Sequence, residues 1–322
     1  MINQVLPITV VIASRNRQCE LVNTIKSYLS SFYLPYEIII VDQSDDYQLT
    51  KKFINDINTA VNLKLIHLNR PSSTKARNVG IKLSKNELII FSDDDILVES
   101  NTIYNLYNIF SNEKQIGMIA GININDIIRK KKLTSIYGYI LGKKYLINNR
   151  GYITKSMYGR YPDNIENRIE TEWAMGYFFC VKKTILVKYK IKWDENLVSY
   201  AYAEDLDFSH RYYLACIKEN LECILDPKVK VYHLASPIGR ISNYKGVLMG
   251  IIHREYLSYK LNNSAISSIA TRWSNFGEVL IHIITFKNPL LFIKAYFCCL
   301  INRRQLKDGI IPNSIKEYFQ NN

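Results

Sequence analysis

The chain has 322 residues, of which 48% are hydrophobic and 22% charged, so it carries enough apolar sequence to bury a core and is not largely disordered. Its formal net charge is +13, and residues 228–322 hold 13 Lys and Arg against 4 Asp and Glu, which is +9 of that total. A basic C-terminal third suits nucleic acid, an anionic membrane surface or a phosphate-bearing acceptor, although a solvated basic face is the commoner explanation.

Apolar runs alternate with helical patterns through the first third of the chain. The continuous apolar runs predict four buried strands, at residues 8–13, 37–41, 63–68 and 88–91. Apolar residues at helical spacing predict three helices between them, at residues 21–29, 49–57 and 75–83. This alternation is typical of an α/β fold with a parallel sheet and right-handed crossovers.

Polar clusters follow three of these strands, at residues 14–17, 42–46 and 93–95. In open parallel sheets, ligands bind beyond the carboxyl ends of the strands. Because all three clusters fall at that edge, we expect them to form one site.

The pattern changes after residue 116. Residues 117–121, 173–181 and 229–234 are predicted strands, residues 205–217 are a predicted helix, and the remainder from about residue 236 is predicted to be helical and basic. Residues 123–172 form a long polar stretch without a clean period, and a loop of that length inside a compact domain is usually functional or mobile.

Asp93, Asp94 and Asp95 form the most informative cluster. Three adjacent carboxylates repel one another, so at least one pKa would be raised unless a cation lies beside them. A divalent ion would use their oxygens as hard ligands, while a solvated acidic turn explains the triplet about equally well. His233 is a candidate third ligand, although a lone histidine is more often an ordinary packed or surface residue.

Glu204 and Asp205 begin the predicted helix at residues 205–217. The helix dipole favours acidic residues there, which explains them without any function. The functional interpretation is that one of them is a general base facing an acceptor hydroxyl. Arg77, in the first turn of another helix, could bind a phosphate or a pyrimidine, or be an ordinary exposed arginine.

Taken in order along residues 5–235, these segments resemble the family-2 glycosyltransferases of the GT-A fold. The matching segments are PITVVIASRNR (7–17), VDQSDD (41–46), ARNVG (76–80), SDDD (92–95), AMGYFFCV (174–181) and EDLD (204–207) followed by Arg211. The SDDD segment occupies the DXD position of that family. A DXD motif alone is a weak signal, whereas the ordered set is specific. The resemblance implies a Rossmann-like, mixed and mostly parallel sheet flanked by helices, with a helical C-terminal extension.

The resemblance also implies an inverting glycosyltransferase of bacterial surface polysaccharide biosynthesis. Such an enzyme uses Mn²⁺ or Mg²⁺ to move one sugar from a UDP-, GDP- or dTDP-sugar to a saccharide acceptor. The implied nucleotide-sugar contacts are Ala13, Arg15, Asp42, Arg77, Asp93 and Asp94. The implied metal ligands are Asp93, Asp95 and His233. Asp205 would be the catalytic base with Glu204 as its neighbour, and Trp173 and Gly176 would contact the acceptor.

By the same resemblance, residues 1–115 are the nucleotide-sugar-binding half, residues 116–235 the acceptor-binding and catalytic half, and residues 236–322 the basic helical extension. Two departures from the family pattern matter. The Gln-x-x-Arg-Trp signature of processive synthases is absent, which favours addition of a single sugar. The usual glycine after Asp42 is also missing, which puts the shape of the base pocket in doubt.

The C-terminal region leaves its partner open. Residues 279–304 mix apolar residues with lysine and end in two arginines, so they suit either an anionic membrane surface or packing on protein, including a homodimer. A membrane contact would fit a lipid-diphosphate-linked acceptor, which His253 and Arg254 could meet. Six cysteines without a CxxC pair, no cleavable signal and no apolar run of about 18 residues predict a cytoplasmic protein, peripheral on the inner face of the cell membrane at most.

Two rival functions are open on the sequence alone. A metal-dependent phosphodiesterase or nuclease also uses clustered carboxylates and a basic groove, but it normally holds two ions with ligands from several elements. A non-catalytic carbohydrate-binding module would suit the basic charge. Nucleic acid is not an expected partner, because no RNA- or DNA-binding motif occurs.

Overall fold

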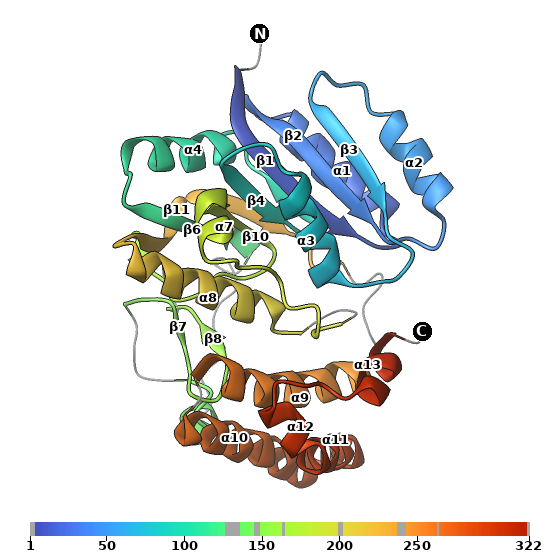
Figure 1. Cartoon of the computed structure of the whole chain (residues 1–322), viewed down its shortest axis with the longest axis vertical. Coiled ribbons are helices and arrows are strands. Elements are labelled where there is room, and N and C mark those ends of the chain that lie inside the picture. Colours follow the sequence, from blue (N-terminus) through green and yellow to red (C-terminus); the bar gives the residue numbers. More distant parts are fainter. Residues whose placement is uncertain are drawn as a thin grey trace.

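A nine-stranded mixed sheet forms the centre of the protein, with helices on both of its faces (Figure 1). The computed structural model describes residues 4–125, 136–144, 149–162, 165–198, 202–236, 243–262 and 264–320. The first third contributes parallel strands β1 (Gln4–Ser14), β2 (Tyr33–Asp42), β3 (Asn62–His67) and β4 (Leu88–Ser92). Helices α1 (Gln18–Leu29), α2 (Tyr47–Asn55) and α3 (Ser73–Leu83) connect them, which confirms the predicted α/β class.

The second half completes the same sheet. Its strands are β5 (Ile96–Val98), β6 (Ile116–Asn123), β9 (Ile169–Glu170), β10 (Phe178–Lys182) and β11 (Glu222–His233). Its helices are α4 (Thr102–Asn112), α6 (Ile136–Ile140), α7 (Lys183–Lys188) and α8 (Glu204–Lys218), and a separate hairpin pairs β7 (Tyr152–Ile153) with β8 (Gly159–Arg160). The strand order is β3-β2-β1-β4-β10-β6-β11-β5, with β9 paired to β11.

One predicted strand is too long, and two further elements were not predicted. The predicted strand at residues 173–181 is only β10, because residues 173–177 turn away from the sheet and bond to α8. The backbone N–H of Ala174 donates to Ser209 Oγ (2.9 Å) and that of Gly176 donates to Asp205 Oδ2 (2.9 Å). Strand β5 and helix α4, which the apolar pattern did not single out, also belong to the fold.

Each face of the sheet has its own apolar core. Leu21 and Ile25 of α1 pack with Leu106 of α4 on one face. Trp193 and Phe208 pack on the other, where their rings stack with centroids 4.2 Å apart. With both faces covered, the strands must be apolar throughout, which is why they appear in the sequence as continuous runs rather than as alternating patterns.

The strand register brings the predicted polar clusters to one edge. Ser14 of β1 lies opposite Asp42 of β2, and Ile12 lies opposite Ser92, the last residue of β4. The antiparallel pair β11–β5 places His233 opposite Ile96, directly after the acidic triplet. Segments more than 130 residues apart in the chain therefore end at the same place.

A helical extension lies below the sheet, at the end of the molecule opposite the N-terminus (Figure 1). It contains α9 (Asn243–Asn262), α10 (Ala265–Ile284), α11 (Pro289–Ile301), α12 (Arg303–Lys307) and α13 (Asn313–Gln320). Its core includes Met157 and Leu206 of the preceding segments, so its apolar packing is continuous with α8. Within the described part of the chain, no helix combines the length and apolar character needed to cross a membrane.

His253 and Arg254 lie inside this extension, which makes the predicted contact with a diphosphate wrong. His253 is fully buried on α9 and Arg254 is 4% exposed. Burial lowers the pKa of His253 to about 4, so its imidazole is neutral at physiological pH.

A buried ion network fixes α9 to α8. Lys260 Nζ lies 2.6 Å from Asp194 Oδ2 and 2.7 Å from Asp207 Oδ1, and Asp207 also pairs with Arg211. Asp207 is fully buried, so its charge depends on these partners. Because Asp207 lies on the first turn of α8, the network also fixes the start of that helix.

We predict that Lys260→Met lowers the thermal unfolding midpoint, because it leaves two carboxylates with fewer partners. The expected loss is about 2–3 kcal/mol. Lys307→Met is the matched control, since Lys307 is exposed on α12. Equal unfolding midpoints for the two variants would show that the network does not stabilise the fold.

Candidate active site

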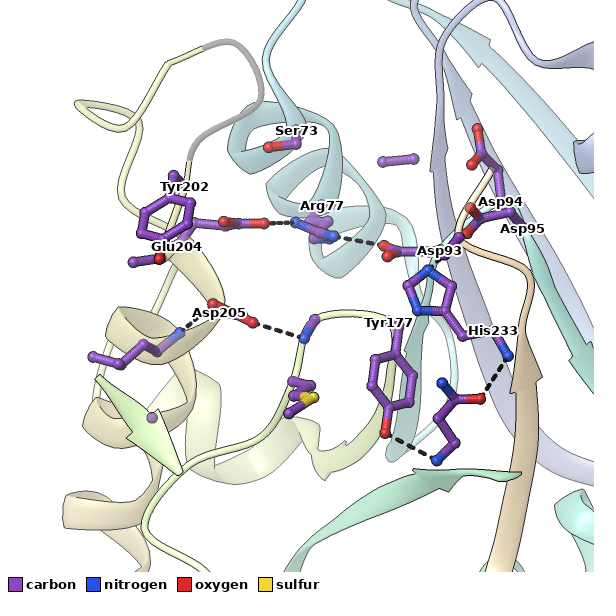
Figure 2. A pocket seen from close by; sticks show the side chains of 18 of the residues that line it. Ser73, Arg77, Asp93, Asp94, Asp95, Tyr177, Tyr202, Glu204, Asp205 and His233 are labelled. Carbon is purple, nitrogen blue, oxygen red and sulfur yellow. Dashed lines mark hydrogen bonds and ion pairs between the residues drawn. The ribbon is translucent and has the colours of Figure 1, made fainter. Parts of the chain in front are cut away.

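A cavity of about 610 Å³ opens at the carboxyl edge of the sheet, beside the N-terminal ends of α3 and α8 (Figure 2). The predicted site residues that line it are Ala13, Arg15, Arg77, Asp93, Asp94, Asp95, Trp173, Gly176, Glu204, Asp205 and His233. Only Asp42 among the predicted site residues lies outside the wall. The fold therefore brings nearly the whole predicted set together, while the role of each residue remains a prediction.

Asp93, Asp95 and His233 form a cluster that fits a divalent cation. One potential ligand atom from each lies within 4.8 Å of the others, and His233 Nε2 is 3.2 Å from Asp95 Oδ1. The imidazole is held in place, because Tyr177 stacks on it with ring centroids 5.2 Å apart. Two carboxylates and an imidazole are ligands that Mn²⁺ accepts readily.

The pKa values of the two aspartates shift in opposite directions because their partners differ. Desolvation raises the pKa of Asp93, although Arg77 opposes the shift. Desolvation acts on Asp95 too, but the hydrogen bond and charge of His233 dominate and lower its pKa. A cation at this cluster would favour the ionised form of both carboxyls.

Asp94 points toward the loop after β1 rather than into the metal cluster. Its Oδ2 accepts a hydrogen bond from Ser14 Oγ (2.8 Å) and its Oδ1 accepts one from Arg17 Nη1 (3.0 Å). Burial raises the pKa of Asp94 to about 7, against the attraction of Arg17. Arg17 lines the cavity and was not singled out by the sequence, although it belongs to the predicted polar cluster at residues 14–17.

Arg77 joins the two acidic parts of the cavity. Its Nη2 donates to Asp93 Oδ1 (2.9 Å) and its Nη1 donates to Glu204 Oε1 (2.9 Å), as Figure 2 shows. The guanidinium also lies over the ring of Trp193, 4.5 Å from its centroid. Arg77 is only 5% exposed, so it is a fixed cation within the cavity wall and not an exposed helix residue.

Asp205 is held by backbone donors at the start of α8. Its Oδ2 accepts from the N–H of Gly176 (2.9 Å) and its Oδ1 from the N–H of Leu206 (2.8 Å). A Cβ on Gly176 would lie 3.2 Å from the Asp205 Cβ, so only glycine allows this close approach without a shift. Ala203, which precedes the helix, has φ 66°, a strained conformation of the kind that concentrates at functional sites.

Glu204 and Asp205 are adjacent carboxyls in a poorly solvated place. Desolvation and then the charge of Asp205 raise the pKa of Glu204 to about 8, although Arg77 opposes the shift. Desolvation also raises the pKa of Asp205, against its two backbone hydrogen bonds. The negative charge of the pair is better placed on Asp205, because backbone N–H donors favour its ionised form.

The loop after β2 lies beside the cavity. Asp42 is fully buried, accepts a hydrogen bond from Ser44 Oγ (2.6 Å) and is not among the residues that line the cavity. Gln43 lines the cavity instead, and its side-chain oxygen accepts a hydrogen bond from the N–H of Ser72 at the start of α3. Gln43 therefore ties this loop to α3.

The wall of the cavity also contains residues that the sequence did not reveal. Tyr158, Arg160 and Tyr202 line the cavity and come from the long polar stretch and from the segment before α8. Trp173 is 5% exposed and stacks on Tyr161, with ring centroids 4.8 Å apart. No hydrophobic period marks these residues, because they come from loops and from the two-residue strand β8.

Residues 9–174, more than half of the chain, match the family described as Glycosyl transferase family 2. The chain belongs to this family. A curated relative is the poly(ribitol-phosphate) beta-N-acetylglucosaminyltransferase TarP of Staphylococcus aureus (strain N315), with 29% identity over 188 residues. The match covers 58% of this chain and 51% of TarP, so the chain spans about half the length of that relative.

Solved structures of glycosyltransferases share the fold. TarS residues 1–349 of S. aureus, in complex with UDP-GlcNAc, give a TM-score of 0.55 at 15% identity, covering 96% of this chain and 83% of that one. The mannosyltransferase PcManGT of Pyrobaculum calidifontis, in complex with GDP-Man and Mn²⁺, gives 0.54 at 11% identity, covering 97% and 84%. These likenesses confirm the predicted GT-A fold with its helical extension.

We predict that Mn²⁺ raises the thermal unfolding midpoint of the protein, and that Asp95→Asn and His233→Gln lose most of this rise. An ion at a hundredfold excess over its dissociation constant stabilises the folded state by about 2.7 kcal/mol. Asp45→Asn is the control, because the Asp45 side chain is 76% exposed and lies outside the cluster. An undiminished rise in both cluster variants would place the ion elsewhere.

Proposed function

We propose that this protein is an inverting, metal-dependent glycosyltransferase that moves one sugar from a nucleoside-diphosphate sugar to a hydroxyl of a carbohydrate acceptor. One observation carries the proposal. A single cavity holds a cation-binding cluster at Asp93, Asp95 and His233 and a backbone-held carboxylate at Asp205, with Arg77 between them. The cation-binding cluster is suited to stabilising a leaving diphosphate, and the Asp205 carboxylate is suited to accepting the proton of an attacking hydroxyl.

The reaction follows from these positions. The Asp205 carboxylate accepts the proton of the acceptor hydroxyl while the hydroxyl oxygen attacks the anomeric carbon of the donor. The bond from that carbon to the diphosphate oxygen breaks, and its electron pair leaves with the diphosphate. Attack from the opposite side inverts the anomeric configuration. A divalent ion held by Asp93, Asp95 and His233 would supply positive charge to the diphosphate.

Arg77 and Glu204 support both halves of this reaction. The Arg77 guanidinium adds fixed positive charge beside the metal cluster. Glu204 holds the other side of that guanidinium and lies next to Asp205, so it positions the cation without acting as the base. The nucleotide-sugar contacts that we propose from the family resemblance are Ala13, Arg15, Asp42, Arg77, Asp93 and Asp94, with Trp173 and Gly176 on the acceptor side.

The relatives suggest which substrates to try first. The name of TarP describes transfer of N-acetylglucosamine to poly(ribitol-phosphate), and TarS was solved with UDP-GlcNAc. PcManGT was solved with GDP-Man and Mn²⁺. We therefore propose UDP-sugars as the first donors, GDP- and dTDP-sugars as the next, and a role in bacterial surface polysaccharide assembly with Mn²⁺ or Mg²⁺ as cofactor.

Family membership disfavours the two rival functions. A two-metal nuclease needs a second ion position, and the described residues contain a single three-ligand group. A binding module has no need for a desolvated carboxylate fixed by two backbone donors.

For the chain as a whole, we propose residues 1–115 as the donor half, residues 116–235 as the acceptor and catalytic half, and residues 236–322 as the extension.

We predict that, with Mn²⁺ and a carbohydrate acceptor present to take the sugar, one of the UDP-, GDP- or dTDP-sugars releases its nucleoside diphosphate, and that Asp205→Asn lowers kcat by about 10²- to 10⁴-fold. Affinity for the nucleotide sugar should change little, because Asp205 contacts the acceptor. Asp56→Asn, an exposed aspartate at the end of α2, is the control. If no nucleotide sugar is consumed, the proposed function is wrong; if Asp205→Asn is fully active, only the base is wrongly assigned.

We further propose that the extension contacts an anionic membrane through the turn between α10 and α11. Ile284 is 74% exposed, Phe286 89% and Leu290 70%, so a group of large apolar side chains lies at this turn. Residues 279–307 contain five Lys and Arg and no Asp or Glu, which complements anionic lipid. This contact would hold the enzyme beside a lipid-diphosphate-linked acceptor at the inner face of the cell membrane.

We predict that the protein sediments with vesicles of phosphatidylglycerol and phosphatidylcholine but not with vesicles of phosphatidylcholine alone. Phe286→Ser should weaken sedimentation strongly, whereas Phe32→Ser should not, because Phe32 is also exposed (57%) but directly precedes β2, outside the extension. No sedimentation with either vesicle, together with a dimer in analytical ultracentrifugation that Phe286→Ser dissociates, would instead identify the turn as a homodimer contact.

A further inference from the structure

Arg160 differs from the other arginines of the cavity wall. Arg15 pairs with Asp45, Arg17 with Asp94, and Arg77 with Asp93 and Glu204. Among the described residues, Arg160 has no carboxylate partner. Its Nε donates to the Lys143 carbonyl oxygen (2.8 Å) and its Nη1 to the carbonyl oxygen of Gly159 (3.1 Å). These neutral acceptors orient the guanidinium without neutralising its charge.

A second guanidinium strengthens the positive charge at this place. Arg160 lies over the ring of Tyr158, with its Cζ 4.9 Å from the centroid, and Arg254 lies 4.1 Å from the centroid of the same ring. Arg254 is 4% exposed and its Nη1 has no hydrogen-bond partner. The carboxylate of Glu278, whose charge acts on Arg254, is itself paired with Lys143.

Holding such charges in the wall is costly unless something compensates them. A desolvated cation without a counter-ion is unfavourable, and burial lowers the pKa of Arg160 for that reason. Arginine in this state is suited to a ligand phosphate, because its planar N–H groups match two phosphate oxygens. Since Arg160 lines the cavity, a ligand that enters the cavity can reach it.

The structure also places Arg160 on the acceptor side. The short segment from Trp173 to Gly176 connects Arg160 to Asp205, the proposed general base. Trp173 Nε1 donates to the carbonyl oxygen of Arg160 (3.2 Å), and the N–H of Gly176 donates to Asp205 (2.9 Å). Tyr202 lies close enough to Arg160 and to Asp205 for both charges to act on its hydroxyl. The diphosphate side of the cavity has its own cations in Arg17 and Arg77.

We propose that Arg160 binds a phosphate group of the acceptor, so that the enzyme selects a phosphodiester-linked carbohydrate or polyol chain over a neutral one. This proposal rests on the proposed glycosyltransferase function and names the class of its acceptor. Tyr158 and Arg254 are positioning residues in this proposal. The ring of Tyr158 holds the Arg160 guanidinium, and Arg254 raises the positive potential around it. Neither residue contacts the reacting hydroxyl.

The test measures binding, so it does not depend on finding the donor. Poly(ribitol phosphate) and dextran of similar length are titrated calorimetrically into the protein with UDP and Mn²⁺ present. Wild type should bind poly(ribitol phosphate) and not dextran, and Arg160→Gln should weaken binding of the phosphate polymer by about 10- to 100-fold. Arg160→Lys keeps the positive charge but loses the paired N–H donors of the guanidinium, so its affinity for poly(ribitol phosphate) should lie between those of wild type and Arg160→Gln. Arg150→Gln is the control, since Arg150 is 44% exposed and pairs with Glu172.

Two results would overturn the proposal. One is equal affinity of Arg160→Gln and wild type for poly(ribitol phosphate), and the other is failure of wild type to prefer that polymer over dextran. UDP affinity, measured in the same variants, should not change, and thermal unfolding identifies a variant that fails to fold. If the proposed glycosyltransferase function itself is wrong, the result is different: the phosphate polymer binds through Arg160, but no nucleotide sugar is consumed.

Discussion

The Arg77 guanidinium holds two groups of buried carboxylates in one cavity. Without it, Asp93 and Glu204 would face each other across a poorly solvated space. Its own position is fixed by Trp193 and by α3, which approaches β1 so closely that a Cβ on Gly80 would lie 2.2 Å from a methyl carbon of Val11. Packing between a helix and the central strand therefore places the charge on which the site depends.

Carboxyl groups crowd together around Arg77, although Arg15 and Arg160 also line the cavity. Its wall holds five carboxyl groups, at Asp93, Asp94, Asp95, Glu204 and Asp205. Arg17, Arg77 and His233 compensate only some of them, and burial raises the pKa of Asp94 to about 7 and that of Glu204 to about 8. A bound divalent cation would relieve this repulsion and would also attract a diphosphate, so the same charge imbalance explains the need for an ion and for the donor.

The sequence predicts the parts of the site that strands and helices carry. Asp93 and Asp95 follow a strand buried on both faces, Asp205 lies in the first turn of α8 and Arg77 at the start of the second turn of α3, so hydrophobic pattern alone brings them to one edge. Pattern fails where backbone leaves the sheet to bond with side chains, as at residues 173–177. Tyr202 lies in an irregular segment and Arg160 in the two-residue strand β8, which is too short to give a hydrophobic pattern, so only the three-dimensional contacts single them out. The contact between Gln43 and Ser72 is equally absent from the pattern.

The helical extension packs against the part of the cavity wall that the start of α8 forms. Met157 and Leu206, which line the cavity, share an apolar core with Leu248 and Ile252 of α9. Lys260 adds an ion network that fixes α9 to the helix that carries Asp205. Helices α10 and α11 lie farther from the sheet than α9 (Figure 1). A surface that binds the turn between them would therefore also orient the part of the cavity that carries Asp205, since the packing through α9 leaves little freedom for independent movement.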